Sequence, residues 1–287
     1  MTGTLFIFGY GYSAGALARL LVPHGWTVRG TTRNSDKCDA IRADGVTPVL
    51  WPGEAPDLSG VTHLLSTAGP AESGDPVLAA LRPEIEALAP SLTWAGYLST
   101  TGVYGDHDGG WVDEETPVAP TSRRGELRAG AEAEWRSIPG LPLHIFRLAG
   151  IYGPGRGPFA KVRAGTARRI VKPGQVFSRI HVEDIAQVLA ASMAQPRPGA
   201  VYNLCDDDPA PPQDVIAHAA RLLNLPPPPE QPFEQAEMTP MARSFYSENK
   251  RVRNDRIKTE LGVKLAYPTY REGLRHLLAV ETGNEGV

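Results

Sequence analysis

The sequence predicts an α/β protein built on a doubly wound parallel sheet, with a smaller C-terminal subdomain. Two observations predict this fold. Short apolar runs alternate with helical patterns over the first hundred residues, and a glycine-rich turn joins the first apolar run to the first helix. The size agrees, because 287 residues of which 41% are hydrophobic can bury a full core.

Six strands are expected in the N-terminal half, each a short apolar run bounded by turn residues. They cover residues 5–8, 26–31, 47–50, 63–67, 96–99 and 143–148. The first helix presents Leu17, Leu20 and Leu21 on one face, since their spacing follows the helical period. A second helix begins at Asp75, which suits an N-cap, and Pro76 suits its first turn.

The composition changes after residue 150, where glycine and proline cluster over residues 153–158. A helix over 182–194 and a strand over 201–204 are expected beyond this loop. We therefore assign residues 1–150 to the N-terminal part of the sheet. Residues 151–287 are expected to add the last sheet strand, further helices and the smaller subdomain, with a frayed tail from Asn284.

Charge and composition exclude several classes of protein. The formal net charge is -3, with 29 basic against 32 acidic residues, so no basic field favours nucleic acid. No apolar run is long enough to span a membrane, and no signal-peptide pattern is present, so we expect a cytoplasmic protein. Cys38 and Cys205 match no zinc spacing and are expected to be reduced thiols, and no metal site is predicted.

The turn between the first strand and the first helix has the pattern of a phosphate-binding loop. Gly9 permits a tight turn, and Gly11 lets the backbone approach a pyrophosphate. Tyr12, Ser13 and Ala14 open the helix, whose N–H groups and dipole attract an anion. The alternative is a glycine-rich turn with no ligand, but the strand, helix and second strand stand at the spacing of a dinucleotide-binding Rossmann fold.

The end of the second strand predicts which dinucleotide is bound. NAD enzymes place an acid there for the ribose hydroxyls, whereas here the strand ends in Thr32 and Arg33, and the first acid is Asp36 in the loop. A guanidinium forms charge-assisted bonds to a 2′-phosphate. We therefore predict NADP, with NAD as the alternative, and place Arg33 with Thr32 or Ser35 on the phosphate. Otherwise Arg33 is a solvated surface residue.

Four further stretches carry a family resemblance. They are residues 99–105 (STTGVYG), 147–154 (RLAGIYGP), 179–186 (RIHVEDIA) and 267–274 (YPTYREGL). Together with the glycine turn they cover nearly the whole chain, in the order found in the NAD(P)-dependent epimerase/dehydratase family, the extended short-chain dehydrogenases, which the sequence resembles. The resemblance implies a nicotinamide cofactor and a polar carbonyl or sugar-like substrate. We also assign cofactor contacts to Ala68, Gly69 and Ile151.

The chain departs from the catalytic set of that family, which is a Ser or Thr, a Tyr, and a Lys four residues after the Tyr. Thr100 falls at the hydroxyl position. When Glu132 is set against the helix glutamate of the family, Arg124 takes the Tyr position and Arg128 the Lys position. Arginine keeps its proton near neutral pH, so the usual proton relay is missing.

Several residues are candidates to replace the relay. Tyr104 is a possible acid or base, although the resemblance implies a structural role. Arg124 and Arg128 share one face of a helix expected over 125–138, where they either bind an anionic group and polarise a carbonyl or form a solvated basic helix start. Arg156, in a glycine loop, is expected to hold a substrate phosphate or carboxylate.

Two other polar features are expected to have no role in catalysis or metal binding. His181 is expected to be a packed helix-start residue rather than a catalyst. The acids at 206–208 follow a strand, but consecutive acids in a proline-rich loop are expected to be solvated rather than bound to a metal.

Two functions therefore remain open. The first is an NADP(H)-dependent oxidoreductase or epimerase-like enzyme that acts on a polar carbonyl or sugar-like small molecule. The second is a catalytically inactive NADP-binding regulator or assembly protein, which the missing Tyr and Lys favour. A homodimer is common in the family, and nothing in the sequence decides it.

Overall fold

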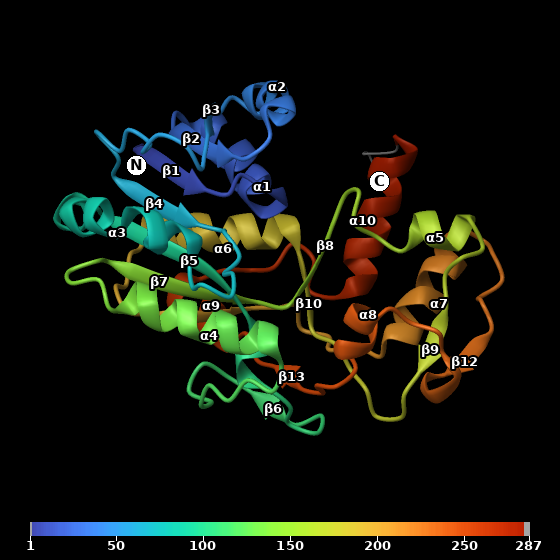
Figure 1. The fold of residues 1–287 in the computed structure, drawn as a ribbon. Helices are drawn as coiled ribbons and strands as arrows, with labels where there is room; N and C mark the ends of the chain where they lie inside the picture. Colours follow the sequence, from blue (N-terminus) through green and yellow to red (C-terminus); the bar gives the residue numbers. More distant parts are fainter. Residues whose placement is uncertain (1, 284–287) are drawn as a thin grey trace.

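The computed structural model describes residues 2–283 and is built on a seven-stranded parallel sheet (Figure 1). The strand order is β11-β7-β5-β4-β1-β2-β3, and every pair in it is parallel. The bounds of the strands are β1 Thr4–Phe8, β2 Thr27–Thr32, β3 Thr47–Leu50, β4 His63–Ser66, β5 Trp94–Thr100, β7 Leu143–Leu148 and β11 Val201–Leu204. The predicted doubly wound fold is confirmed, and each predicted strand bound agrees to within two residues.

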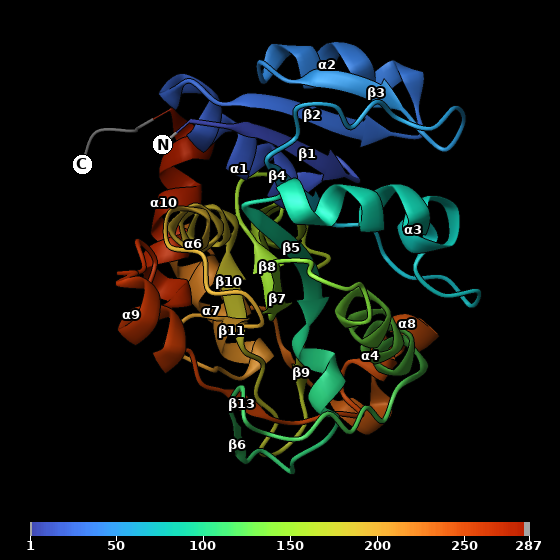
Figure 2. The same ribbon diagram turned by 90° about the vertical axis from the view of Figure 1, so that its left-hand side faces the viewer.

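Helices cover both faces of this sheet, as Figure 2 shows. Those on one face pack into one apolar cluster, and those on the other face pack into a second. The first group is α1 (Tyr12–Leu21), α6 (Val182–Ala194) and α9 (Asp255–Leu261), and the second is α3 (Pro76–Leu88) and α4 (Arg123–Arg136). A short helix, α2 (Cys38–Ala43), joins β2 to β3.

The strands are apolar along their length because both faces of the sheet are covered. All side chains from Leu5 to Phe8 in β1 are fully buried. The predicted cap of α3 is confirmed, since the buried Asp75 carboxylate accepts hydrogen bonds from the N–H groups of Val77 and Leu78. One prediction about α1 is wrong. Leu20 is 39% exposed, because α1 turns Leu17 and Leu21 toward the core instead.

The chain after residue 150 serves two parts of the molecule. It returns α6, β11 and α9 to the sheet, and it also forms a smaller C-terminal lobe with its own apolar cluster (Figure 1). The lobe contains α5 (Phe159–Arg163), β9 (Arg169–Val171), α7 (Pro212–Leu222), β12 (Glu230–Pro232), a 3-10 turn (Phe233–Gln235), α8 (Pro240–Ser244) and α10 (Tyr270–Thr282). Between residues 2 and 283, no helix is long and apolar enough to cross a membrane. The expected frayed tail from Asn284 lies outside the described residues.

Two-stranded parallel ribbons, which were not predicted from the sequence, lie outside the main sheet. The pairs are β8 (Gly150–Tyr152) with β10 (Arg179–His181), β9 with β12, and β6 (Trp111–Val112) with β13 (Arg251–Val252). Each strand has two or three residues, too short for an alternating pattern to be read from sequence. Cys38 and Cys205 are free thiols.

Candidate functional site

The turn after β1 has the geometry that the glycine pattern predicts. Gly9 has φ +88°, a left-handed conformation that suits glycine, and a Cβ there would lie 2.9 Å from Thr67 Oγ1. The Gly9 N–H donates to Thr31 Oγ1 at 2.8 Å, and the Tyr10 N–H donates to the Thr31 carbonyl at 2.7 Å. The Thr67 hydroxyl donates to the Gly9 carbonyl. The turn is therefore fixed to both neighbouring strands.

The start of α1 leaves backbone donors for an anion. Gly11 is the N-cap, and the first bond of the helix runs from the Gly15 N–H to the Gly11 carbonyl at 2.9 Å. The N–H groups of Tyr12, Ser13 and Ala14 precede that bond, and the first turn has no acidic residue. A Cβ on Gly11 would meet no atom nearer than 3.9 Å, so the backbone is open there. These features fit the pyrophosphate of a dinucleotide.

The end of β2 presents a cation beside this turn. Arg33 is exposed, and it forms no ion pair with any acid of the described chain. Thr32 is buried, and its hydroxyl bonds locally to the backbone of Asn34. Asp36 is exposed one short turn further on, in the 3-10 helix Ser35–Lys37.

Thr100 is the last residue of β5, at the carboxyl edge of the sheet. Its Oγ1 accepts a hydrogen bond from the Gly102 N–H at 3.1 Å. The proton of the Thr100 hydroxyl is then available for a substrate oxygen. The neighbouring Ser99 hydroxyl is buried and donates to Glu132 instead.

Arg128 is brought to the same edge from α4. Its Nη1 donates to the Leu98 carbonyl at 2.9 Å, to the Tyr97 hydroxyl at 3.1 Å and to the Ala68 carbonyl at 3.3 Å. A Cβ on Gly69 would lie 3.7 Å from Arg128 Nη2. The structure thus brings together three residues that the sequence analysis selected separately, in the peptide after β4 and on α4.

Arg124 lies one turn before Arg128 on α4 and is exposed. Its guanidinium carbon is 5.3 Å from the ring centre of Phe245, which follows α8. Arg123 next to it forms ion pairs with Glu72 and Glu126, whereas Arg124 has no carboxylate partner among residues 2–283. Arg124 therefore offers a positive charge with no carboxylate partner among residues 2–283, at the position where the sequence resemblance leads us to expect the Tyr.

Tyr104 does not reach this edge as an acid or base. Its side chain is fully buried, and its hydroxyl donates to Asn203 Oδ1 at 2.7 Å. Burial raises the pKa of Tyr104 to about 12, against the lowering effect of Arg147, whose guanidinium lies 4.8 Å from the ring centre. Arg147 in turn pairs with the buried Glu132 on α4, with N–O distances of 2.8 Å and 3.1 Å. Tyr104 is accordingly placed as a packing residue.

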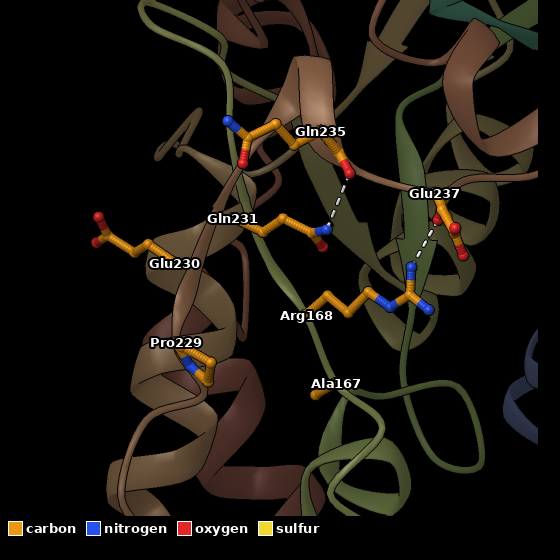
Figure 3. Close-up of a pocket in the computed structure, with 7 residues that line it drawn as sticks. All are labelled: Ala167, Arg168, Pro229, Glu230, Gln231, Gln235 and Glu237. Atoms are coloured by element: carbon orange, nitrogen blue, oxygen red, sulfur yellow. Dashed lines mark hydrogen bonds between the residues drawn. The ribbon is translucent and has the colours of Figure 1, made fainter.

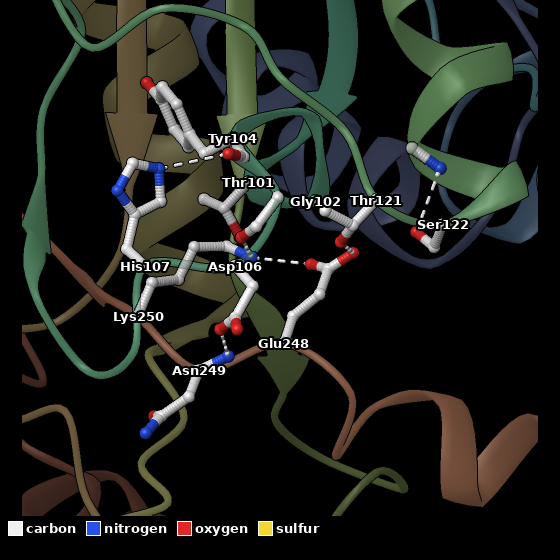
Figure 4. A network of polar contacts seen from close by, with 12 residues as sticks. Thr101, Gly102, Tyr104, Asp106, His107, Thr121, Ser122, Glu248, Asn249 and Lys250 are labelled. Carbon is white, nitrogen blue, oxygen red and sulfur yellow. Dashed lines mark hydrogen bonds and ion pairs between the residues drawn. The ribbon is translucent and has the colours of Figure 1, made fainter.

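A polar network that the sequence analysis missed borders the site (Figure 4). Lys250 Nζ donates to the Gly105 carbonyl and to Glu248 Oε2, both at 2.6 Å, and the Thr121 hydroxyl donates to Glu248 Oε1. The Asn249 N–H donates to Asp106 at 2.7 Å. These bonds tie the segment before β13 to the turn after β5 and to the start of α4. No sequence signal marks the bonds from Lys250 to Gly105, from Thr121 to Glu248 and from Asn249 to Asp106, because these partners are more than 100 residues apart.

The loop after β8 lies against the phosphate-binding helix. Ile151 in β8 is half-buried and packs against the core on the α1 side of the sheet. The exposed Arg156 places its guanidinium carbon 4.6 Å from the ring centre of Tyr12. The Tyr12 hydroxyl donates to the Pro154 carbonyl at 2.8 Å. Arg156 is therefore near the cofactor turn, although the sequence analysis expected it to hold a substrate.

The structural roles expected for His181 and for the acids at 206–208 have different outcomes. His181 is buried and caps α6 by accepting from the Glu183 N–H, as predicted. The expectation that the acids at 206–208 are solvated is wrong for Asp206, which is 1% exposed. Its N–H donates to the carbonyl of Arg179 in β10. Burial raises the pKa of Asp206 to about 8, although Arg179 lowers it. The described chain has no group of His, Cys, Asp and Glu residues able to hold a metal ion.

A cavity of about 450 Å³ lies in the C-terminal lobe (Figure 3). It is lined by Ala167, Arg168, Pro229, Glu230, Gln231, Gln235 and Glu237. Arg168 donates to the Glu237 carbonyl and Gln231 donates to the Gln235 carbonyl, so these polar groups are already paired. None of the lining residues belongs to the predicted site, and we assign the cavity no function.

Comparison with solved structures supports the same class of fold. A conserved protein of unknown function from Silicibacter pomeroyi DSS is 66% identical, with TM-score 0.95 over 97% of this chain and 99% of that one. A protein from Methylobacillus flagellatus assigned to the NAD-dependent epimerase/dehydratases is 26% identical, with TM-score 0.71 over 98% and 99%. The dTDP-glucose 4,6-dehydratase of Bacillus anthracis with NAD shares the fold at a TM-score of 0.78 and 18% identity, over 99% of this chain and 97% of that one. Human epimerase family protein SDR39U1 with NADPH shares it at a TM-score of 0.75 and 18% identity, over 96% of this chain and 98% of that one.

Sequence relatives complete the comparison. No family model matches the chain. Protein YeeZ of Escherichia coli K12 is 30% identical over 278 residues, which cover 91% of this chain and 95% of YeeZ. The 3-diazoavenalumate denitrifying reductase of a Streptomyces species is 31% identical over 182 residues, 57% of this chain and 58% of that protein. The chain therefore belongs to the family of YeeZ, and it shares the fold of NAD-dependent epimerases and dehydratases.

Proposed function

We propose that this protein is an NADP(H)-dependent oxidoreductase that acts on a polar carbonyl compound or sugar-like molecule with an anionic group. The observation that carries the proposal is the convergence of the phosphate-binding turn, Thr100, Arg128 and the Ala68–Gly69 peptide at one edge of the sheet. The carboxyl edge of an open parallel sheet is where ligands bind in such folds. The Streptomyces relative, which is named a reductase, supports oxidoreductase chemistry.

The cofactor assignment rests on Arg33. Gly9, Gly11 and the first N–H groups of α1 suit a pyrophosphate, and neighbours of this fold hold NAD or NADPH. The exposed Arg33 side chain forms no ion pair with a carboxylate among residues 2–283, so it suits the additional 2′-phosphate of NADP. Ala68 lies next to Gly9 of the same turn, and Ile151 packs on the α1 side of the sheet; these two residues complete the proposed cofactor contacts.

The substrate would be held by residues that replace the missing Tyr. A bound nicotinamide supplies hydride chemistry. The Thr100 hydroxyl, whose oxygen already accepts from the Gly102 N–H, would donate a hydrogen bond to the substrate carbonyl oxygen and polarise it. The Arg124 guanidinium binds the anionic group of the substrate and stabilises charge that develops on the oxygen, while water supplies the proton. Arg128 would fix the Ala68–Gly69 peptide of the cofactor site through its bond to the Ala68 carbonyl, while its bonds to the Tyr97 hydroxyl and the Leu98 carbonyl hold it on β5.

The cofactor part is tested by Arg33→Ala. The loss of one charge-assisted contact of about 1.5–3 kcal/mol predicts NADPH affinity roughly 10-fold to 100-fold weaker, with NADH affinity nearly unchanged. The matched control is Lys37→Ala, an exposed cation of the same loop. Titration with each dinucleotide measures both constants. Equal losses for NADPH and NADH contradict the assignment of Arg33 to the 2′-phosphate.

The catalytic part is tested by the loss of NADPH absorbance with a panel of aldehydes, ketones and sugar nucleotides, neutral and anionic. Thr100→Val is expected to lower kcat/KM roughly 100-fold while NADPH binding stays intact, because one preorganised donor is lost. Thr101→Val is the control, since its hydroxyl donates to the Leu148 carbonyl instead. A Thr100→Val variant as active as wild type would remove Thr100 from the mechanism.

One observation favours a second function, that of a regulator or assembly protein without catalysis. The chain has neither Tyr nor Lys at the relay positions, and Tyr104 is buried away from the edge. A regulator or assembly protein that binds NADP without turnover would have this set of residues. Tight NADPH binding together with no turnover across the panel would decide for the regulator and against the enzyme.

A further inference from the structure

We propose that Arg156 closes over the pyrophosphate of the bound dinucleotide, so that the loop after β8 forms the second half of the phosphate site. This inference rests on the proposed cofactor. It assigns Arg156 to the cofactor instead of to the substrate, and it gives the Tyr12 side chain the role of a support for Arg156.

The loop that carries Arg156 is a tight turn of defined geometry. The Arg156 N–H donates to the Gly153 carbonyl at 2.8 Å, and the Gly153 N–H donates back to the Arg156 carbonyl at 3.2 Å. Pro154 and Gly155 take the two central positions, and Gly155 has φ +73°. Proline followed by glycine with positive φ is what a type II turn requires. Arg156 is therefore held by a short, hydrogen-bonded loop.

This turn is attached directly to the phosphate-binding helix. The Tyr12 hydroxyl, from the first residue of α1, donates to the Pro154 carbonyl at 2.8 Å. Gly153 permits the close approach, because a Cβ there would lie 2.4 Å from the Tyr12 hydroxyl and 2.7 Å from Val182 Cγ1. The loop therefore keeps its position relative to the free N–H groups of α1.

The charge arrangement then points to an anion. The Arg156 guanidinium lies 4.6 Å from the ring centre of Tyr12, and no carboxylate between residues 2 and 283 forms an ion pair with it. By contrast, Arg163 further along the same segment pairs with Glu281 at 2.6 Å. Because Tyr12 is the first residue of α1, this guanidinium lies close to the N-terminus of the helix. The first turn of α1 has no acidic side chain that would repel an anion there. A doubly charged pyrophosphate complements both the guanidinium and the helix N-terminus.

Fragments of the cofactor separate this role from that of Arg33. NADPH and NADH both contain the pyrophosphate, whereas adenosine 2′-monophosphate has the 2′-phosphate and no pyrophosphate. Arg156→Ala is expected to weaken NADPH and NADH alike, roughly tenfold, and to leave adenosine 2′-monophosphate unchanged. Arg33→Ala is expected to weaken NADPH and adenosine 2′-monophosphate and to spare NADH. Tyr12→Phe, which removes the bond to Pro154, is expected to weaken both dinucleotides by a smaller factor.

The experiment is a calorimetric titration of the cofactor-free protein with the three ligands, at two salt concentrations. Arg163→Ala is the matched control, because it removes a paired arginine of the same segment. Circular dichroism checks that each variant is folded. The Arg156 inference is overturned if wild type binds NADPH and Arg156→Ala binds it equally well, or if Arg156→Ala weakens adenosine 2′-monophosphate by the same factor. A wild-type protein that binds neither dinucleotide instead overturns the proposed function itself.

Discussion

Glu132→Gln is expected to destabilise the fold strongly, because it removes the countercharge of a buried arginine. Glu132 is 3% exposed and Arg147 4% exposed, and the two side chains form a two-bond ion pair between α4 and β7. Ser99 of β5 donates to the same carboxylate, and the Arg147 guanidinium stacks on Tyr104. The pair thus joins the helix that carries Arg124 and Arg128 to the two strands beneath it.

The magnitude follows from the burial of both partners. Breaking a buried ion pair from one side leaves an uncompensated charge and costs about 3–5 kcal/mol. For a chain of this size each kcal/mol lowers Tm by roughly 2–4 °C, so a Tm decrease of roughly 10 °C is expected. Replacing both partners, as Glu132→Leu with Arg147→Met, removes the orphaned charge and is expected to recover most of the loss.

Thermal unfolding followed by circular dichroism measures the effect. Glu126→Gln is the control on the same helix, since Glu126 is half exposed and its pair with Arg123 is a surface pair worth at most about 1 kcal/mol. A Glu132→Gln protein that is no less stable than Glu126→Gln would refute the role of this pair. So would a double substitution as unstable as the single one.

Three further predictions concern individual side chains. Arg128→Met loses three hydrogen bonds and is expected to cost about 2 kcal/mol of stability and to weaken NADPH binding. A titration that shows wild-type affinity for NADPH would contradict the proposed role of Arg128 in the cofactor site. Burial raises the pKa of Asp206 to about 8, so the folded protein holds a proton that the unfolded chain loses near its ordinary value of 3.8. The contribution of Asp206 to the free energy of unfolding is therefore most favourable at low pH and becomes less favourable as the pH rises from about 4 to about 8. Asp206→Asn should then raise Tm more above pH about 8 than near pH about 5. An equal change in Tm at both pH values would contradict this. Tyr104→Phe loses one buried hydrogen bond to Asn203 and should lower stability by about 1–2 kcal/mol without changing kcat; a large loss of kcat would restore Tyr104 as a catalytic residue.

The strands and main helices could be predicted because their patterns are local. A strand covered on both faces is an unbroken apolar run, as residues 5–8 show, and the Asp75 cap is set by neighbouring residues. Leu20 was predicted wrongly because leucines at 17, 20 and 21 do not all fit on the narrow buried face of α1, and the packing of α1 against α6 decides which are buried. The short ribbons were missed because strands of two or three residues have no pattern.

The site could be predicted in part for the same reason. The glycine turn is contiguous in sequence, and Thr100, Arg124 and Arg128 were found from motif positions. What sequence cannot give is long-range pairing. The Lys250 and Glu248 network, the burial of Asp206 and the stacking of Arg156 on Tyr12 all join segments that only the fold brings together.

The central claim is that the turn after β1 binds a nicotinamide dinucleotide and that Arg33 selects the phosphorylated form. The most direct measurement is a titration of purified, cofactor-stripped protein with NADPH and, separately, with NADH. Tight NADPH binding together with NADH binding at least roughly tenfold weaker is the predicted result. Binding of neither dinucleotide would contradict the account, because the fold would then have kept the turn without its ligand.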